Sequence, residues 1–154
     1  MASLPKSIHE NLRDEFKFAA SKVAEATTVS AKAFYFSAFF GQTGRQLNMH
    51  WDADLALLWS VVQHASNAIN GRLATASGEY PTAGFPEGFL EAIDEVSTEL
   101  AGAFEGDEID VPRLYAALAR TSELTYLTTG NGIYLYEKGF IKLMTYSSAP
   151  EQPS

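Results

Sequence analysis

The sequence predicts an all-α protein, an antiparallel bundle of about five helices, and three observations support this. Apolar residues recur every three or four positions over several long segments, runs of turn-forming residues separate those segments, and one aromatic-rich segment is apolar on nearly every side. The chain has 154 residues, 46% of them hydrophobic, which is enough to bury a sizeable core in one domain. We expect that domain over residues 1–147 and a flexible tail over residues 148–154.

The helix expected over residues 31–47 is the element around which the others would pack. Aromatic side chains in its stretch AKAFYFSAFF point to nearly every side of a helical wheel: Phe34, Tyr35, Phe36, Phe39 and Phe40. A helix that is apolar all round is normally buried all round, so this one is predicted to lie in the core. Gly41 and Gly44 interrupt this helix and would let another backbone approach it closely.

Three amphipathic helices are expected around this central one, over residues 5–26, 50–76 and 86–106. Each has one apolar stripe, as in Ile8, Leu12, Phe16, Ala19 and Val23 of the first. The helix over 50–76 has an apolar arc wider than one neighbouring helix would bury. It therefore either packs between two helices or forms part of an oligomer interface.

The last helix begins near Asp110 and Pro112, and the pattern beyond residue 124 fits two structures. Residues 124–146 are dense in Thr, Tyr and Ile, and Asn131-Gly132 is a strong two-residue turn signal, so a short β-hairpin would fit. Apolar residues at helical spacing also fit a broken helix. We favour the helix, because a small β-meander in a helical domain still needs a partner face.

Charge is concentrated in one segment of this acidic chain, whose net charge is −8. Residues 73–112 contain ten Asp and Glu and no Lys or Arg. We expect an acidic face over residues 79–110 for a basic protein partner, formed by Glu87, Glu91, Asp94, Glu105, Asp107 and Glu108. Such a face disfavours direct binding to DNA.

The chemistry that the chain can support is narrowed by its composition. It has no cysteine, which excludes thiol catalysis, disulfides and cysteine-bound zinc. We expect no metal and no cofactor. A segment long and apolar enough to span a membrane is also lacking, since about 20 such residues are needed, and the charged start of the chain does not resemble a signal peptide. We expect a soluble, cytoplasmic protein with no membrane association.

Arg45 and His50, in the stretch RQLNMH, have the R-x4-H spacing of HEPN nucleases, and the chain resembles that family over these six residues. HEPN nucleases are small helical proteins, usually dimers. The resemblance implies that Arg45 would bind an RNA phosphate and that His50 would assist attack by the 2′-hydroxyl or departure of the leaving group. Gln46 departs from the Asn, Asp or His that the family usually has after the arginine.

A set of aromatic residues and one histidine forms the candidate ligand or interface site: Trp51, Trp59, Phe36, Phe40 and His64. Aromatic side chains are common at interfaces and in pockets for apolar ligands. We therefore expect a non-catalytic interaction or assembly protein, a homo-oligomer. A HEPN-like ribonuclease and a small apolar ligand binder are the two alternatives.

Overall fold

The computed structural model describes residues 4–75, 85–129, 133–137 and 140–144, and it confirms the predicted all-α bundle. The described helices are α1 (Lys6–Glu25), α2 (Val29–Phe36), α3 (Ala38–Leu47), α4 (Ala53–Thr75), α5 (Phe89–Gly102) and α6 (Val111–Thr129). Two strands follow, β1 (Ile133–Glu137) and β2 (Phe140–Met144). The tail expected over residues 148–154 lies outside the described residues.

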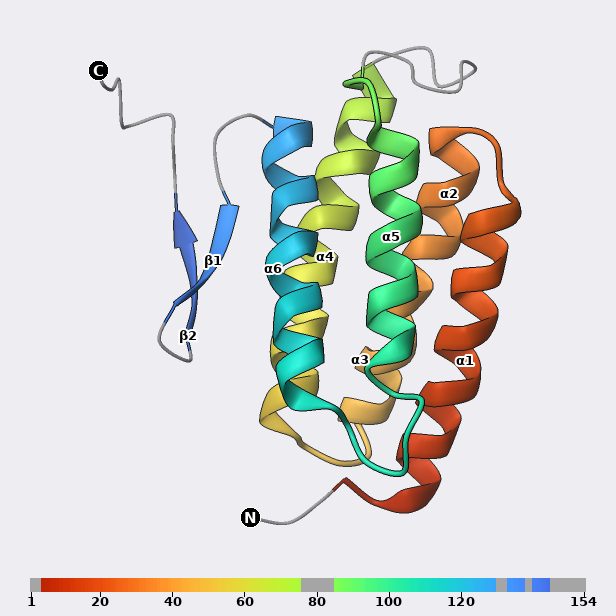
Figure 1. The fold of residues 1–154 in the computed structure, drawn as a ribbon, viewed down its shortest axis with the longest axis vertical. Coiled ribbons are helices and arrows are strands. Elements are labelled where there is room, and N and C mark those ends of the chain that lie inside the picture. Colours follow the sequence, from red (N-terminus) through yellow and green to blue (C-terminus); the bar gives the residue numbers. More distant parts are fainter. Residues whose placement is uncertain (1–3, 76–84, 130–132, 138–139, 145–154) are drawn as a thin grey trace.

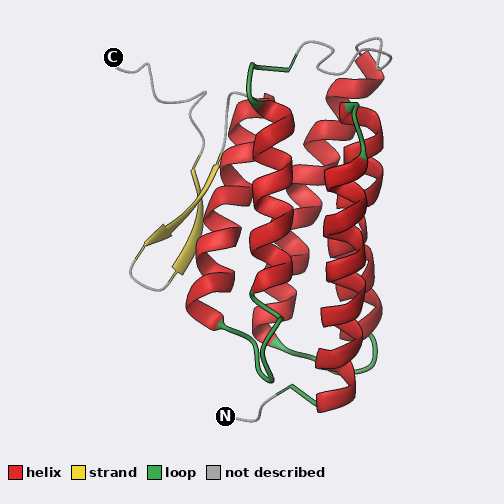
Figure 2. Cartoon of the chain, turned by 45° about the vertical axis from the view of Figure 1, so that its right-hand side comes forward, coloured by secondary structure: helices red, strands yellow, loops and turns green. Residues whose placement is uncertain are grey.

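The helices run along the length of the molecule (Figures 1 and 2). Helices α2 and α3 follow one another in the same direction, and every other successive pair of helices reverses direction. Helix α1 packs against α5 and against α2 and α3, α3 packs against α4, and α4 packs against α6, which closes the ring by packing on α5. Because α5 intervenes in sequence, the neighbours α4 and α6 run in the same direction.

A cluster of buried phenylalanines joins α1 to the elements on either side. The ring of Phe16 on α1 lies 5.0 Å from that of Phe39 on α3 and 4.9 Å from that of Phe104, which follows α5. Phe36 lies 5.7 Å from Phe39 in the same core. All four side chains are fully buried, so the predicted stripe of α1 faces the centre of the bundle.

The aromatic segment is neither one helix nor buried all round, and this part of the prediction is wrong. It begins at Val29, where Thr28 caps α2 by accepting a hydrogen bond from the Ala31 N–H, and it is divided at Ser37. Phe36 and Phe39 are 0% exposed, whereas Phe34 is 71% exposed. The reason is that α1, α4 and α5 cover only the inner side of these short helices.

The wide apolar arc of α4 is explained within one chain. Helix α4 lies between α3 and α6 and also contacts α2. Its buried residues therefore face different neighbours: Leu55, Leu58, Val61, Val62, Ala65 and Ile69. Packing between two helices is therefore observed for these residues, and the oligomer interface stays a prediction, since Trp51 of the same arc is 71% exposed.

Residues beyond α6 form the hairpin rather than the helix that we favoured. Strands β1 and β2 pair antiparallel, with Ile133 opposite Met144 and Glu137 opposite Phe140. The favoured helix is therefore wrong for residues 133–137 and 140–144, although α6 itself continues to Thr129. The β-branched and aromatic residues of IYLYE and FIKLM suit a strand better than a helix.

Candidate functional site

The turn between α3 and α4 forms a fixed corner of the bundle. Helix-type backbone hydrogen bonds continue past the end of α3, from the N–H of Asn48 to Gly44 and from the N–H of His50 to Gln46. The Asp52 carboxylate then caps α4 by accepting from the Leu55 N–H at 2.9 Å. Backbone groups at both helix ends thus find partners at the point where the chain reverses.

An apolar hollow of about 510 Å³ lies at this corner. It is lined by Gly44, Leu47, Asn48, Trp51, Ala56, Trp59 and Ser60, none of which is charged. Both tryptophans of the chain are among these residues. A few polar groups at the edge of an apolar and aromatic wall are typical of binding sites, and the volume lies in their usual range.

Gly44 allows Trp59 to form one wall of the hollow. A Cβ atom at position 44 would lie 2.9 Å from Nε1 of the Trp59 indole and 3.2 Å from its Cδ1. Only glycine therefore lets the ring lie directly against α3 without displacement. The backbone approach predicted at these glycines is not what the structure shows: a side chain approaches Gly44, and a Cβ at Gly41 would meet nothing within 4 Å.

Two strongly exposed apolar side chains belong to the turn that carries the hollow: Trp51, which lines it, and Met49, which follows the lining residue Asn48 in sequence. Met49 is 75% exposed and Trp51 is 71% exposed. Exposed apolar residues grouped at a recess make this turn a candidate interaction surface. We refer to Met49 together with the residues lining the hollow as the corner surface.

The structure brings together only part of the predicted ligand site. Trp51 and Trp59 share the hollow, but Phe36 is fully buried in the core and Phe40 is half-buried against that core. His64 is exposed on α4, one turn beyond Ser60, and does not line the hollow. These three residues are therefore not part of the corner surface.

Sequence reasoning missed the other residues of the hollow, although a signal was present. Gly44, Leu47, Asn48 and Trp51 have the spacing i, i+3, i+4 and i+7 of one helical face. Ala56, Trp59 and Ser60 repeat this spacing on the next helix. Two short helical faces with the same residue spacing, one on each side of a turn, would have predicted that these residues lie around one site.

Arg45 and His50 do not form a joint site within the chain. Arg45 is exposed in the last turn of α3, and His50 is half-buried in the turn that follows. Five residues at about 100° each place them about 140° apart around the helix axis. In the described part of the chain no hydrogen bond or ion pair joins their side chains, so the ribonuclease chemistry remains a prediction.

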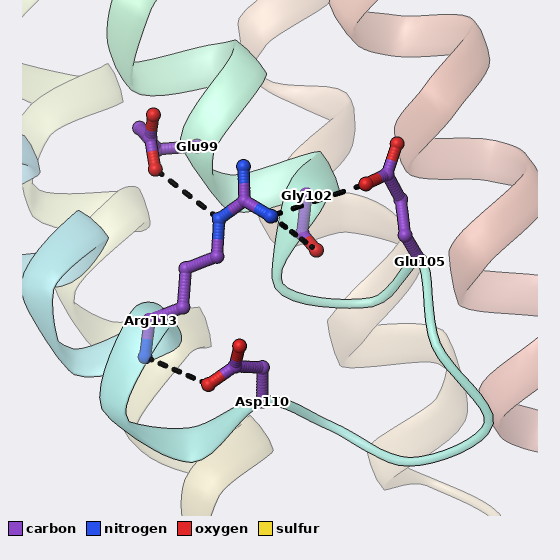
Figure 3. Close-up of polar contacts among 5 residues, drawn as sticks. All are labelled: Glu99, Gly102, Glu105, Asp110 and Arg113. Carbon is purple, nitrogen blue, oxygen red and sulfur yellow. Dashed lines mark hydrogen bonds and ion pairs between the residues drawn. The ribbon is translucent and has the colours of Figure 1, made fainter.

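The acidic residues of α5 are partly neutralised by Arg113 of α6 (Figure 3). Its Nε donates to Glu99 at 3.3 Å, and its Nη1 donates to the Gly102 carbonyl at 3.2 Å and lies 3.9 Å from Glu105. The Asp110 carboxylate accepts from the Arg113 backbone N–H. One guanidinium therefore ties the end of α5 to the start of α6.

Two further cations pair with the middle of α5. Lys32 of α2 lies 2.6 Å from Asp94, and Arg120 of α6 pairs with Glu95. Five of the six predicted acidic residues are exposed toward the two ends of the segment: Glu87, Glu91, Glu105, Asp107 and Glu108. The face expected over 79–110 is thus divided in the described residues, and residues 79–84 lie outside them.

Two other kinds of site were sought in the described residues. There, no group of three His, Asp or Glu side chains is placed to hold a metal ion. None of the described helices has the length and apolar character required to cross a bilayer. The corner surface therefore stays the candidate site that these residues offer.

Comparisons of this chain with protein-family models, with curated proteins and with solved structures find no match. The fold defines a helical bundle, and the corner surface defines a candidate binding site on it. The functional argument therefore rests on that geometry.

Proposed function

We propose that the protein is a non-catalytic interaction protein that docks a protein partner through the corner surface. The observation that carries this proposal is the placement of both tryptophans around one uncharged hollow, with Trp51 71% exposed. Tryptophan and methionine are enriched at protein interfaces, and tryptophan is prominent among the residues that dominate binding energy.

A protein partner accounts for the extent of the surface better than a small molecule does. Met49 does not line the hollow, yet it is the most exposed large apolar side chain among the described residues. A ligand confined to the hollow would leave this side chain in water. A partner that covers the whole corner would bury it together with Trp51.

The hollow can be tested with N-phenyl-1-naphthylamine, a neutral dye whose absorption overlaps tryptophan emission. The protein is kept dilute so that the surface is free. Because both tryptophans line the hollow, bound dye should quench most of the tryptophan emission and gain fluorescence itself. The readout is the dissociation constant of the dye.

Two matched variants on α4 locate the binding. Ala56→Glu places a carboxylate in the hollow, whereas Ala74→Glu adds the same charge at an exposed position of the same helix. We expect dye binding to weaken at least tenfold in Ala56→Glu and to stay unchanged in Ala74→Glu. Equal binding by the two variants would show that the hollow is not an apolar docking site.

A further inference from the structure

A second recess, which has no lining residue in common with the hollow, lies between the start of α1 and the loop that joins α5 to α6. Its volume is about 330 Å³. Polar and charged residues of both segments line it: Lys6, His9, Glu10, Arg13, Asp107 and Glu108. We infer that this recess binds a small zwitterion of the amino-acid class, a molecule with one ammonium and one carboxylate group. This binding site is separate from the corner surface and does not depend on the function proposed for it.

The two sides of the recess carry opposite charges. Helix α1 contributes the cations Lys6 and Arg13, and the loop contributes the carboxylates of Asp107 and Glu108. Among the residues that the structure describes, no hydrogen bond or ion pair joins these cations to these carboxylates. Lys6 pairs loosely with Glu10 of its own helix, at 3.9 Å. A ligand that carries both signs can therefore meet both sides, with its carboxylate toward α1 and its ammonium group toward the loop.

His9 supplies a buried polar atom that has no hydrogen-bond partner among the described residues. Its side chain is 3% exposed, and its ring centroid lies 5.7 Å from that of Phe104. Nε2 lies 2.7 Å from the Gly106 carbonyl oxygen, which can only accept, so Nε2 carries a proton and donates it. Nδ1 of the neutral ring is then an acceptor, and it is the atom without a partner. Because an unpartnered buried acceptor is costly, an N–H of the ligand's ammonium group is the expected donor.

The loop on the other side of the recess is held in place by contacts within the chain. The Asp110 backbone N–H donates to the Ala103 carbonyl at 2.9 Å and closes the loop. Arg113 binds the Gly102 carbonyl and lies 3.9 Å from Glu105 (Figure 3). The histidine hydrogen bond described above fastens the same loop to α1. The recess is therefore preorganised, and its volume lies at the lower end of the range for small-molecule sites.

An NMR titration of the ¹⁵N-labelled whole chain, read at the amide signals of the loop, tests the inference. The probes are three zwitterions of increasing length: glycine, β-alanine and 4-aminobutyrate. Each is compared with the amine and the carboxylate that carry one of its two charges: methylamine and acetate, ethylamine and propionate, and propylamine and butyrate. We expect at least one zwitterion to bind about tenfold more tightly than both of its analogues, because it meets both sides of the recess. Absence of binding by all three zwitterions, or equal binding of each zwitterion and its amine, would overturn the inference.

Two double variants with the same loss of charge separate the recess from a general attraction of cations to this acidic chain. Asp107→Asn/Glu108→Gln removes the carboxylates of the loop. Glu87→Gln/Glu91→Gln removes two exposed carboxylates at the other end of α5. We expect the tightest zwitterion to bind about tenfold more weakly to the first variant and with unchanged affinity to the second. Equal affinities in the two variants would show that the loop carboxylates do not bind the ligand, and the inference would fail.

His9→Gln tests the buried histidine. Glutamine keeps a side-chain N–H for the Gly106 carbonyl but removes the Nδ1 acceptor. We expect about tenfold weaker binding of the tightest zwitterion while the far-UV circular dichroism spectrum stays that of the wild type. Undiminished binding by a folded His9→Gln chain would contradict the inference. Should this variant fail to fold, the loop variant decides, because its two residues are exposed.

Discussion

The ammonium group of Lys32 lies 2.6 Å from the carboxylate of Asp94 and also donates to the Val23 carbonyl at 2.7 Å. Lys32 is almost fully buried, and its two partners belong to α5 and to the last turn of α1. The carbonyls of a final turn lack partners within their own helix, and a cation there is favourable. One side chain of α2 therefore links three helices.

Replacing Lys32 by Met should lower the free energy of unfolding by about 1–3 kcal/mol, because the buried Val23 carbonyl loses its donor. Lys6→Met is the control, since Lys6 is largely exposed and its pairing with Glu10 at 3.9 Å should contribute less than about 0.5 kcal/mol. Urea unfolding followed by circular dichroism measures both. Equal losses in the two variants would contradict the role given to Lys32.

The aromatic segment should show two very different responses to truncation. Phe39→Ala removes a fully buried ring that contacts Phe16 and should cost about 3–5 kcal/mol. Phe34→Ala removes an exposed ring and should change the free energy of unfolding by less than about 0.5 kcal/mol. Chemical unfolding compares them, and a large loss in Phe34→Ala would mean that this side of α2 is covered.

Two glycines of α3 should respond differently to replacement by alanine. Gly41→Ala should raise the free energy of unfolding by up to about 1 kcal/mol, since alanine favours a helix and its methyl group meets open space. Gly44→Ala gains the same propensity but forces the Trp59 indole to move. We expect less stabilisation, a shifted tryptophan emission maximum and weaker dye binding. Identical behaviour of the two variants would show that Gly44 does not seat Trp59.

RNA cleavage tests the alternative function. Because Arg45 and His50 lie on different sides of the α3 terminus, we expect the wild-type protein to degrade single-stranded RNA no faster than an Arg45→Ala/His50→Ala variant purified in the same way. Gel analysis of a labelled RNA over several hours provides the comparison. Cleavage that is lost in the double variant would replace the non-catalytic proposal with the ribonuclease.

Periodicity predicted the amphipathic helices well because their stripes are unambiguous. Leu12 and Phe16 repeat at helical spacing and lie in the core, as predicted. The aromatic segment has no such contrast between its faces. Whether Phe34 or Phe36 points inward depends on where α1 and α4 lie, and that information is not local. The burial of Lys32 has the same cause, since Asp94 is 62 positions away in sequence.

The corner surface was predicted only in part for a related reason. The two tryptophans stood out by residue type, but the phenylalanines grouped with them turned out to serve the core or its edge. What distinguishes Trp51 from Phe36 is the turn after Leu47, which places Trp51 outside the bundle. A wheel drawn for a single helix does not contain that turn.

The most direct test of the account uses the two tryptophan indole N–H signals in a ¹H–¹⁵N NMR spectrum of the uniformly labelled chain. Both indoles line the hollow, so the account predicts that both signals shift progressively as N-phenyl-1-naphthylamine is added to the protein. In Ala56→Glu they should stay fixed. Indole signals that do not move in the wild type at dye concentrations that saturate binding would contradict the account and place the apolar site elsewhere.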